Sequence, residues 1–238
     1  MRRLKTIIFG GLLLGSLVLA LLLFPQPLFG YSMSHDQFRV WSDRPIDPAM
    51  TRVLNDAVRR LRTSKLYDPD EEFRLFICND AWRLWIFARS TAVGGSADTV
   101  LSRNIYLREA DVASNRLIPP GGVLSDAEVR PLSYFVAHEA THIIESRTFG
   151  RLMKYRYPDW LTEGYADLIG KGGDFDFEEN RRLLQADDNR LDPRRSGLYR
   201  RYHLMVAYLI EGRGHSVEEL FANPPSDAVV LGRLLTSS

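Results

Sequence analysis

The sequence predicts an α+β fold, with a small N-terminal β-sheet followed by a mostly helical C-terminal half and one apolar helix ahead of both. Short apolar or alternating runs typical of strands lie before residue 110, whereas the segments after residue 130 repeat apolar residues at helical spacing. Pro25, Pro27 and Gly30 interrupt the chain after its first apolar run. We therefore expect a first segment over residues 1–30 and a single domain over residues 31–238.

The first segment consists of a short basic head, residues 1–5, and an uncharged run over residues 7–24. As a helix this run is about 27 Å long, close to the hydrocarbon thickness of a bilayer. No small-x-small cleavage site follows it, which favours an uncleaved transmembrane signal anchor over a signal peptide that is removed. The basic head is expected to stay in the cytoplasm and the domain to lie across the membrane. Gly11 and Gly15 have the spacing with which two such helices pack together as a dimer.

The first half of the domain is predicted to contribute the sheet. Three runs have the length and residue types of strands: residues 38–41, 73–78 and 104–108. Asp47 and Pro48 supply an N-cap and a first-turn proline for an amphipathic helix over residues 48–66. Residues 94–98 are rich in glycine and are expected to form a flexible loop. The strand at 104–108 is expected either at the sheet edge, where an extended peptide can pair with it, or in the sheet interior.

The second half is predicted to be helical. Pro131 is expected in the first turn of a long helix that ends at Gly150. Further helices follow at residues 159–170, 177–187 and 197–212, with a pair of short helices between 216 and 235.

The long helix carries the pattern HEATH, residues 138–142. Positions i and i+4 lie on one face of a helix, so His138 and His142 can bind one metal ion while Glu139 projects beside its open side. Glu163, from the next predicted helix, supplies a third ligand. The neighbouring residues are apolar, and burying imidazoles and a carboxylate among them without partners is costly. A single catalytic Zn²⁺ satisfies these groups and keeps one coordination position for water.

Composition excludes other readings of the chain. Removing the three basic residues of the head from the 31 in the chain leaves 28 basic against 30 acidic residues in the domain. This balance gives no reason to expect a nucleic-acid partner. Cys78 is the one cysteine, which excludes an intramolecular disulfide and a multi-thiolate zinc site.

The pattern HEATH together with the block WLTEGYAD, residues 160–167, resembles the gluzincin zinc metallopeptidases, and most of all small bacterial peptidase MA-like domains. The resemblance implies a zincin-like fold in which His138, His142 and Glu163 bind zinc and Glu139 is the general base. It also implies that Asp167, four residues after the third ligand, orients a zinc-bound histidine. The similarity covers about residues 130–212.

The resemblance further implies a tyrosine or histidine on a later helix that stabilises the transition state. Tyr202 matches the position of that tyrosine, with Tyr199, His203 and His215 as neighbouring alternatives. The chain lacks the Gly-x-Met-Glu-Asn block of the M1 aminopeptidases, so an endopeptidase is expected rather than an amino-terminal exopeptidase. The loops 90–103 and 150–158 are expected to shape its pocket.

Together these inferences predict a zinc peptidase that is anchored in the membrane through residues 7–24. It would cleave a peptide or protein substrate by a zinc-activated water, with Glu139 as general base. The expected location is the bacterial inner membrane with the domain on the extracytoplasmic side, or secretion after signal cleavage. The alternative function is a catalytically silent zincin-like domain that binds a peptide or a cell-envelope component.

Overall fold

The computed structural model describes residues 2–119, 130–192, 196 and 198–236. The domain is α+β and contains a five-stranded sheet in the order β1-β2-β3-β5-β4. The three central strands run parallel, and the edge strands β1 and β4 pair with them antiparallel. The strand bounds are β1 Tyr31–His35, β2 Phe38–Ser42, β3 Phe73–Cys78, β4 Gly95–Ala97 and β5 Asn104–Arg108. A separate two-stranded ribbon joins β6 Ala110–Asp111 to β7 Arg116–Leu117.

Both faces of the sheet are covered by helices. Successive side chains of a strand point to opposite sides, so each central strand can contribute to two cores. On β3, Leu75 and Ile77 enter the main core, while Phe76 and Cys78 enter a smaller aromatic core. The main core packs against α2 (Met50–Leu61) and α4 (Leu132–Phe149), and the smaller one against α3 (Ala81–Ala88). The sheet therefore packs against α4, the helix that carries the HEATH pattern, through the main core.

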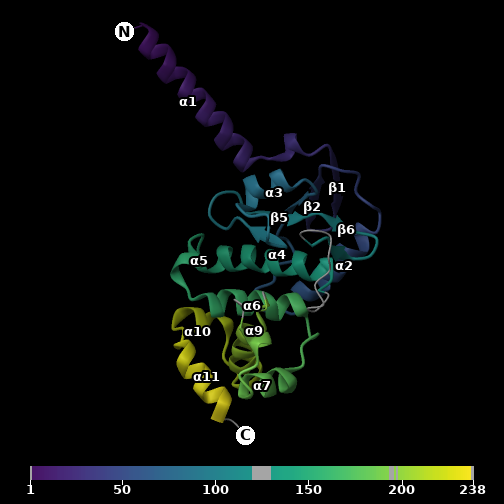
Figure 1. The fold of residues 1–238 in the computed structure, drawn as a ribbon, viewed down its shortest axis with the longest axis vertical. Helices are drawn as coiled ribbons and strands as arrows, with labels where there is room; N and C mark the ends of the chain where they lie inside the picture. The colour runs from purple at the N-terminus through teal and green to yellow at the C-terminus, as the bar shows by residue number, and fades with distance from the viewer. Residues whose placement is uncertain (1, 120–129, 193–195, 197, 237–238) are drawn as a thin grey trace.

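The C-terminal helices stack below α4, with α6 (Asp159–Lys171) beneath it and α9 (Arg200–Ala207) beneath α6 (Figure 1). Gly164 allows α6 and α9 to approach closely, because a Cβ at this position would lie 2.6 Å from the backbone oxygen of Tyr202. The remaining helical segments are η1 Gln26–Leu28, α5 Met153–Arg156, α7 Phe177–Gln185, η3 Asn189–Leu191, the π-helix η4 Tyr208–Gly212, α10 Val217–Ala222 and α11 Asp227–Thr236. This stacking places α6 directly against α4, the helix that carries the HEATH pattern.

The strands expected at 38–41, 73–78 and 104–108 are confirmed, as is the end of the long helix at Gly150. The loop expected at residues 94–98 is wrong, because Gly95–Ala97 forms the edge strand β4. Three residues are too few to show a strand periodicity, and their conformation depends on pairing with β5. The same pairing places the strand at 104–108 in the sheet interior rather than at its edge.

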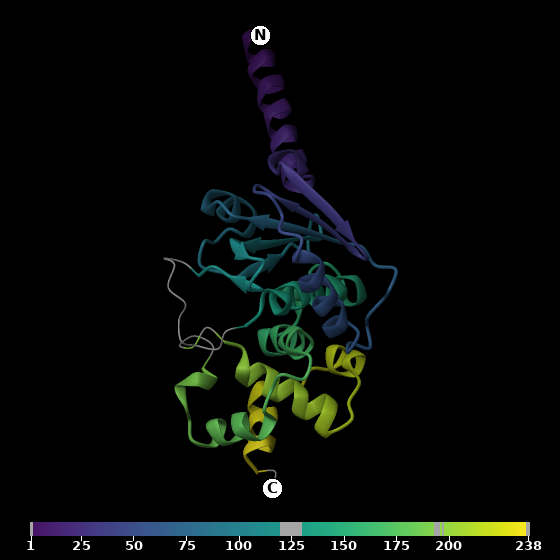
Figure 2. The same cartoon turned by 90° about the vertical axis from the view of Figure 1, so that its right-hand side faces the viewer.

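The predicted membrane anchor is contradicted. The first helix, α1 (Arg2–Leu23), projects from the sheet end of the molecule, opposite the C-terminus (Figure 1, Figure 2). Among the residues that the structure describes, no helix combines the length and the apolar character needed to cross a membrane. The anchor at residues 7–24 and the single-pass placement that depends on it are therefore corrected.

Candidate metal centre

Two histidines of α4 lie one turn apart and face α6. His138 and His142 are 4% and 1% exposed, so both imidazoles are removed from bulk water. Their burial follows from the position of α4 between the sheet and α6, which leaves few of its side chains in contact with solvent. Their ring centroids are 4.9 Å apart, as expected for residues four positions apart on a helix.

Glu163 of α6 completes the cluster. Its Oε2 atom lies 3.3 Å from Nε2 of His138 and 3.5 Å from Nε2 of His142. One ligand atom from each residue lies within 4.8 Å of the other two. Ligand atoms around a tetrahedral zinc at bonds of about 2.0–2.1 Å would be about 3.4 Å apart. The donor set and its spacing therefore fit a zinc ion held by His138, His142 and Glu163.

The charges of this cluster are strongly coupled. Burial alone would raise the pKa of Glu163, but His142 and His138 outweigh it and hold that pKa well below its usual value. For His142, burial and the charge of Lys154 lower the pKa, while Glu163 and Glu145 raise it more strongly, to about 9. The protein without metal thus keeps a proton where a cation would sit, and a metal must displace it.

His142 is oriented by a carboxylate of its own helix. Its Nδ1–H donates to Oε2 of Glu145 at 2.8 Å, and Glu145 is fully buried. This bond fixes the tautomer that leaves Nε2 free to bind a metal. Burial raises the pKa of Glu145, although the bond with His142 opposes the shift. Sequence reasoning missed Glu145, whose i+3 spacing from His142 was a readable signal.

His138 is supported through an intermediate hydroxyl. Its Nδ1 lies 3.4 Å from the hydroxyl of Tyr134, which in turn donates to Oδ1 of Asp167. The other oxygen of Asp167 accepts from Nδ1–H of His203 at 3.0 Å, with Nζ of Lys171 at 3.8 Å. The carboxylate predicted to orient a zinc ligand is therefore near the site, and Tyr134 connects it to His138. Sequence reasoning missed Tyr134 because an aromatic residue in a buried helix is most often core.

The charge of Asp167 is well compensated. Burial would raise its pKa, but the hydrogen bond from His203 and the charges of His203 and Lys171 hold it far below the usual value. Burial and the Asp167 charge raise the pKa of Tyr134 well above its usual value, so its hydroxyl keeps its proton. These protonation states agree with Tyr134 donating to Asp167 and accepting from His138.

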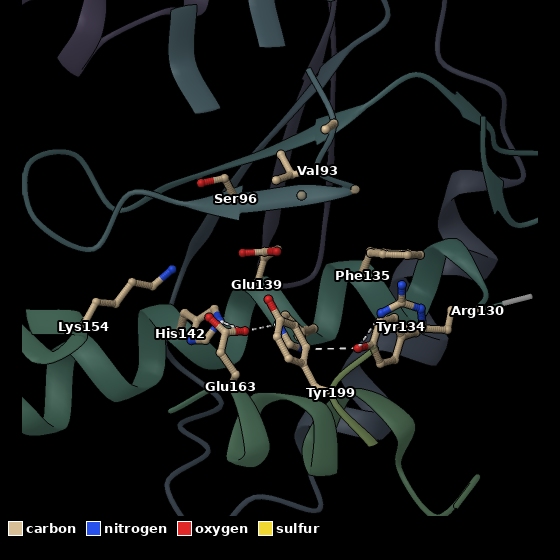
Figure 3. Close-up of a pocket in the computed structure, with 14 residues that line it drawn as sticks. Val93, Ser96, Arg130, Tyr134, Phe135, Glu139, His142, Lys154, Glu163 and Tyr199 are labelled. Carbon is tan, nitrogen blue, oxygen red and sulfur yellow. Dashed lines mark hydrogen bonds and ion pairs between the residues drawn. The ribbon is translucent and has the colours of Figure 1, made fainter. Parts of the chain in front are cut away.

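Glu139 lies between α4 and the edge strand β4 (Figure 3). A Cβ at Gly95 would come within 2.9 Å of its Oε1, so the glycine lets the strand pass directly over this carboxylate. Glu139 is 6% exposed and belongs to none of the ligand pairs described above. It is thus a buried acid beside the metal ligands that does not share their role.

A cavity of about 380 Å³ opens over the cluster. Its walls include the predicted ligands, Glu139, the β4 region from Ala92 to Ser96, Arg130, Phe135, Lys154 and Tyr199. Both loops expected to shape the pocket, 90–103 and 150–158, contribute to it. The strand β4 forms one rim and α6 the opposite side (Figure 3).

Of the four candidate transition-state donors, Tyr199 lines this cavity. Its ring stacks on His138 with centroids 5.7 Å apart, and burial together with Glu163 and Glu139 raises its pKa. Tyr202 stacks behind Tyr199 at 6.0 Å and packs against the main core. His203 is buried against Asp167, whereas His215 is exposed and lies 3.8 Å from Glu219.

No protein-family model, curated protein or solved structure matches this chain. The assignment below therefore depends on the geometry of the site and on the resemblance of its motifs.

Proposed function

We propose that this chain is a zinc-dependent peptidase of the gluzincin type that hydrolyses bonds within a peptide or protein substrate. The observation that carries the proposal is the convergence of His138, His142 and Glu163, whose ligand atoms all lie within 4.8 Å of one another. Glu139 lies beside them in the same cavity without a ligand role. A structural metal site would have no need for this additional buried acid.

A zinc ion held by these ligands would supply a Lewis acid for the scissile carbonyl and a bound water of lowered pKa. Glu139 accepts the proton of the attacking water and delivers it to the leaving amine. We assign the oxyanion donor to Tyr199 rather than Tyr202, because Tyr199 lines the cavity and its raised pKa keeps the phenol protonated. Glu145 and Tyr134 hold the two imidazoles with Nε2 toward the metal position.

The test compares the full chain with its Glu139→Gln variant. We expect both proteins to bind one zinc ion, and the variant to hydrolyse a mixed peptide library about 10²–10⁴-fold more slowly. Glu179→Gln, at a partly exposed acid of α7, is the matched control and should retain full activity. Full activity in Glu139→Gln would exclude this residue as the base. Zinc binding without cleavage of any peptide by the unsubstituted chain would instead favour the silent, peptide-binding alternative.

Export of the domain belongs to the same proposal. A basic head followed by an uncharged run is typical of segments that direct a chain across the cytoplasmic membrane. Cell fractionation and the amino-terminal sequence of the mature protein test it, and a protein found wholly in the cytoplasm would contradict it.

A further inference from the structure

Lys154 lies in the metal-site cavity without a role in holding the ligands. It belongs to the short helix α5, is half-buried and lines the cavity beside the predicted zinc ligands. Figure 3 shows its side chain extending from the His142 end of the site toward the open space below β4. No hydrogen bond or ion pair joins its ammonium group to any residue in the described part of the chain.

The position of Lys154 is fixed by the backbone around it. The preceding Met153 is fully buried, and its amide donates to the backbone oxygen of Gly150 at 3.0 Å. The amide of Tyr157 closes the turn by donating to the oxygen of Met153, also at 3.0 Å. Lys154 therefore extends from a turn held by the core into the metal-site cavity.

The second cation of the cavity is differently engaged. At the opposite end, Arg130 lies over the rings of Tyr134 and Phe135, 5.1 and 4.9 Å from their centroids, and donates to the Tyr134 hydroxyl. Its guanidinium is thereby occupied within the protein. The acids of the cavity, Glu139 and Glu163, are assigned to catalysis and metal binding. An anion that enters the cleft therefore meets Lys154 as its available counter-charge.

We propose that Lys154 is a specificity-determining residue that binds a carboxylate of the peptide substrate in the metal-site cleft. This inference rests on the proposed function, since it names the substrate class of the same site. A partly desolvated ammonium forms a charge-assisted hydrogen bond with a carboxylate, which is stronger than a bond between neutral groups. The carboxylate comes either from an acidic side chain or from the free C-terminus of the peptide.

Peptide binding to the zinc-loaded Glu139→Gln full chain separates these sources without requiring turnover. Fluorescence anisotropy is measured with peptide pairs that differ by internal Glu against Gln, or by a free against an amidated C-terminus. We expect one of the two pairs to show about tenfold tighter binding of the carboxylate form. That pair identifies the source.

Lys154→Met in the same background should abolish this discrimination while leaving the affinity for the neutral peptides within about twofold. Lys154→Glu should reverse the preference. Arg156→Met is the matched control, because Arg156 is an exposed cation of the same helix that lies over the Tyr157 ring and is absent from the cavity walls. It should keep the full discrimination.

Equal binding of both members of every pair, discrimination that survives Lys154→Met, or no binding of any peptide up to millimolar concentration would each overturn the inference. These outcomes differ from failure of the proposed function, which is read as absence of zinc or of hydrolysis by the unsubstituted chain. A chain that cleaves peptides with no preference for an acidic side chain or for a free C-terminus would leave the proposed peptidase function standing and remove the role of Lys154.

Discussion

The two ends of the ligand set are supported in different ways. At one end, His142 and its partner Glu145 lie three residues apart on the same helix. The buried Glu145 carboxylate accepts a hydrogen bond from Nδ1–H of His142 at 2.8 Å. At the other end, His138 contacts a neutral hydroxyl at 3.4 Å, and the charge of Asp167 lies one group further away. The first support needs only α4, whereas the second needs α4, α6 and α9 to be assembled. His142 is thus held by a charged group of its own helix, whereas His138 is held by a longer contact with a neutral group and depends on tertiary packing.

Glu145→Gln should have the largest effect. The amide can still accept from Nδ1–H of His142 but removes the buried negative charge, so zinc affinity should fall about 10–100-fold. A competition titration with a chromogenic chelator measures this. Glu71→Gln is the control, because Glu71 is a largely shielded acid that contacts α4 through Arg147, away from the ligands. Unchanged zinc affinity in Glu145→Gln would mean that the carboxylate has a purely structural role.

The pH dependence of zinc binding sharpens the same comparison. His142 has a pKa raised to about 9, so below that pH zinc must displace its proton. Because one proton is displaced for each zinc ion bound, the apparent zinc affinity should rise about tenfold from pH 7 to pH 8. The rise should end near pH 9, where His142 has lost this proton. Glu145→Gln removes a carboxylate that raises the pKa of His142, so this pKa should fall and the rise in zinc affinity should end at a lower pH. Affinity that does not change between pH 7 and pH 8 would contradict protonation of this end.

Tyr134→Phe should have the smallest effect on zinc. Removal of the hydroxyl disconnects His138 from Asp167, but Asp167 keeps its bond with His203, so affinity should fall by less than about tenfold. Tyr165→Phe is the matched control: Tyr165 is also buried, and its hydroxyl bonds to Ser64 rather than to the site. A loss larger than that of Glu145→Gln would reverse the order of the two supports.

Edge strand β4 shows why part of the site escapes sequence reasoning. Residues 94–98 read as a flexible loop because glycine is common in turns, yet Gly95 is needed for close approach to Glu139 and Leu107. The requirement comes from a side chain on another element. The choice between Tyr199 and Tyr202 is similar. Both tyrosines lie at the start of a helix, and the packing of α9 against α6 decides that Tyr199 lines the cavity.

The sequence by itself determined the features that depend on residues close in the chain. The spacing of His138 and His142 places two imidazoles on one helix face, and Gly150 ends that helix. The next predicted helix added Glu163, and motif resemblance added Asp167 from the same helix. The tertiary structure decided what long-range packing controls: the spacing of Glu163 from both imidazoles, the Tyr134 connection to Asp167, the β4 rim and the direction of Lys154. Helical periodicity can be recognised in a short stretch of sequence, whereas these contacts form only when α4 is enclosed between the sheet and α6.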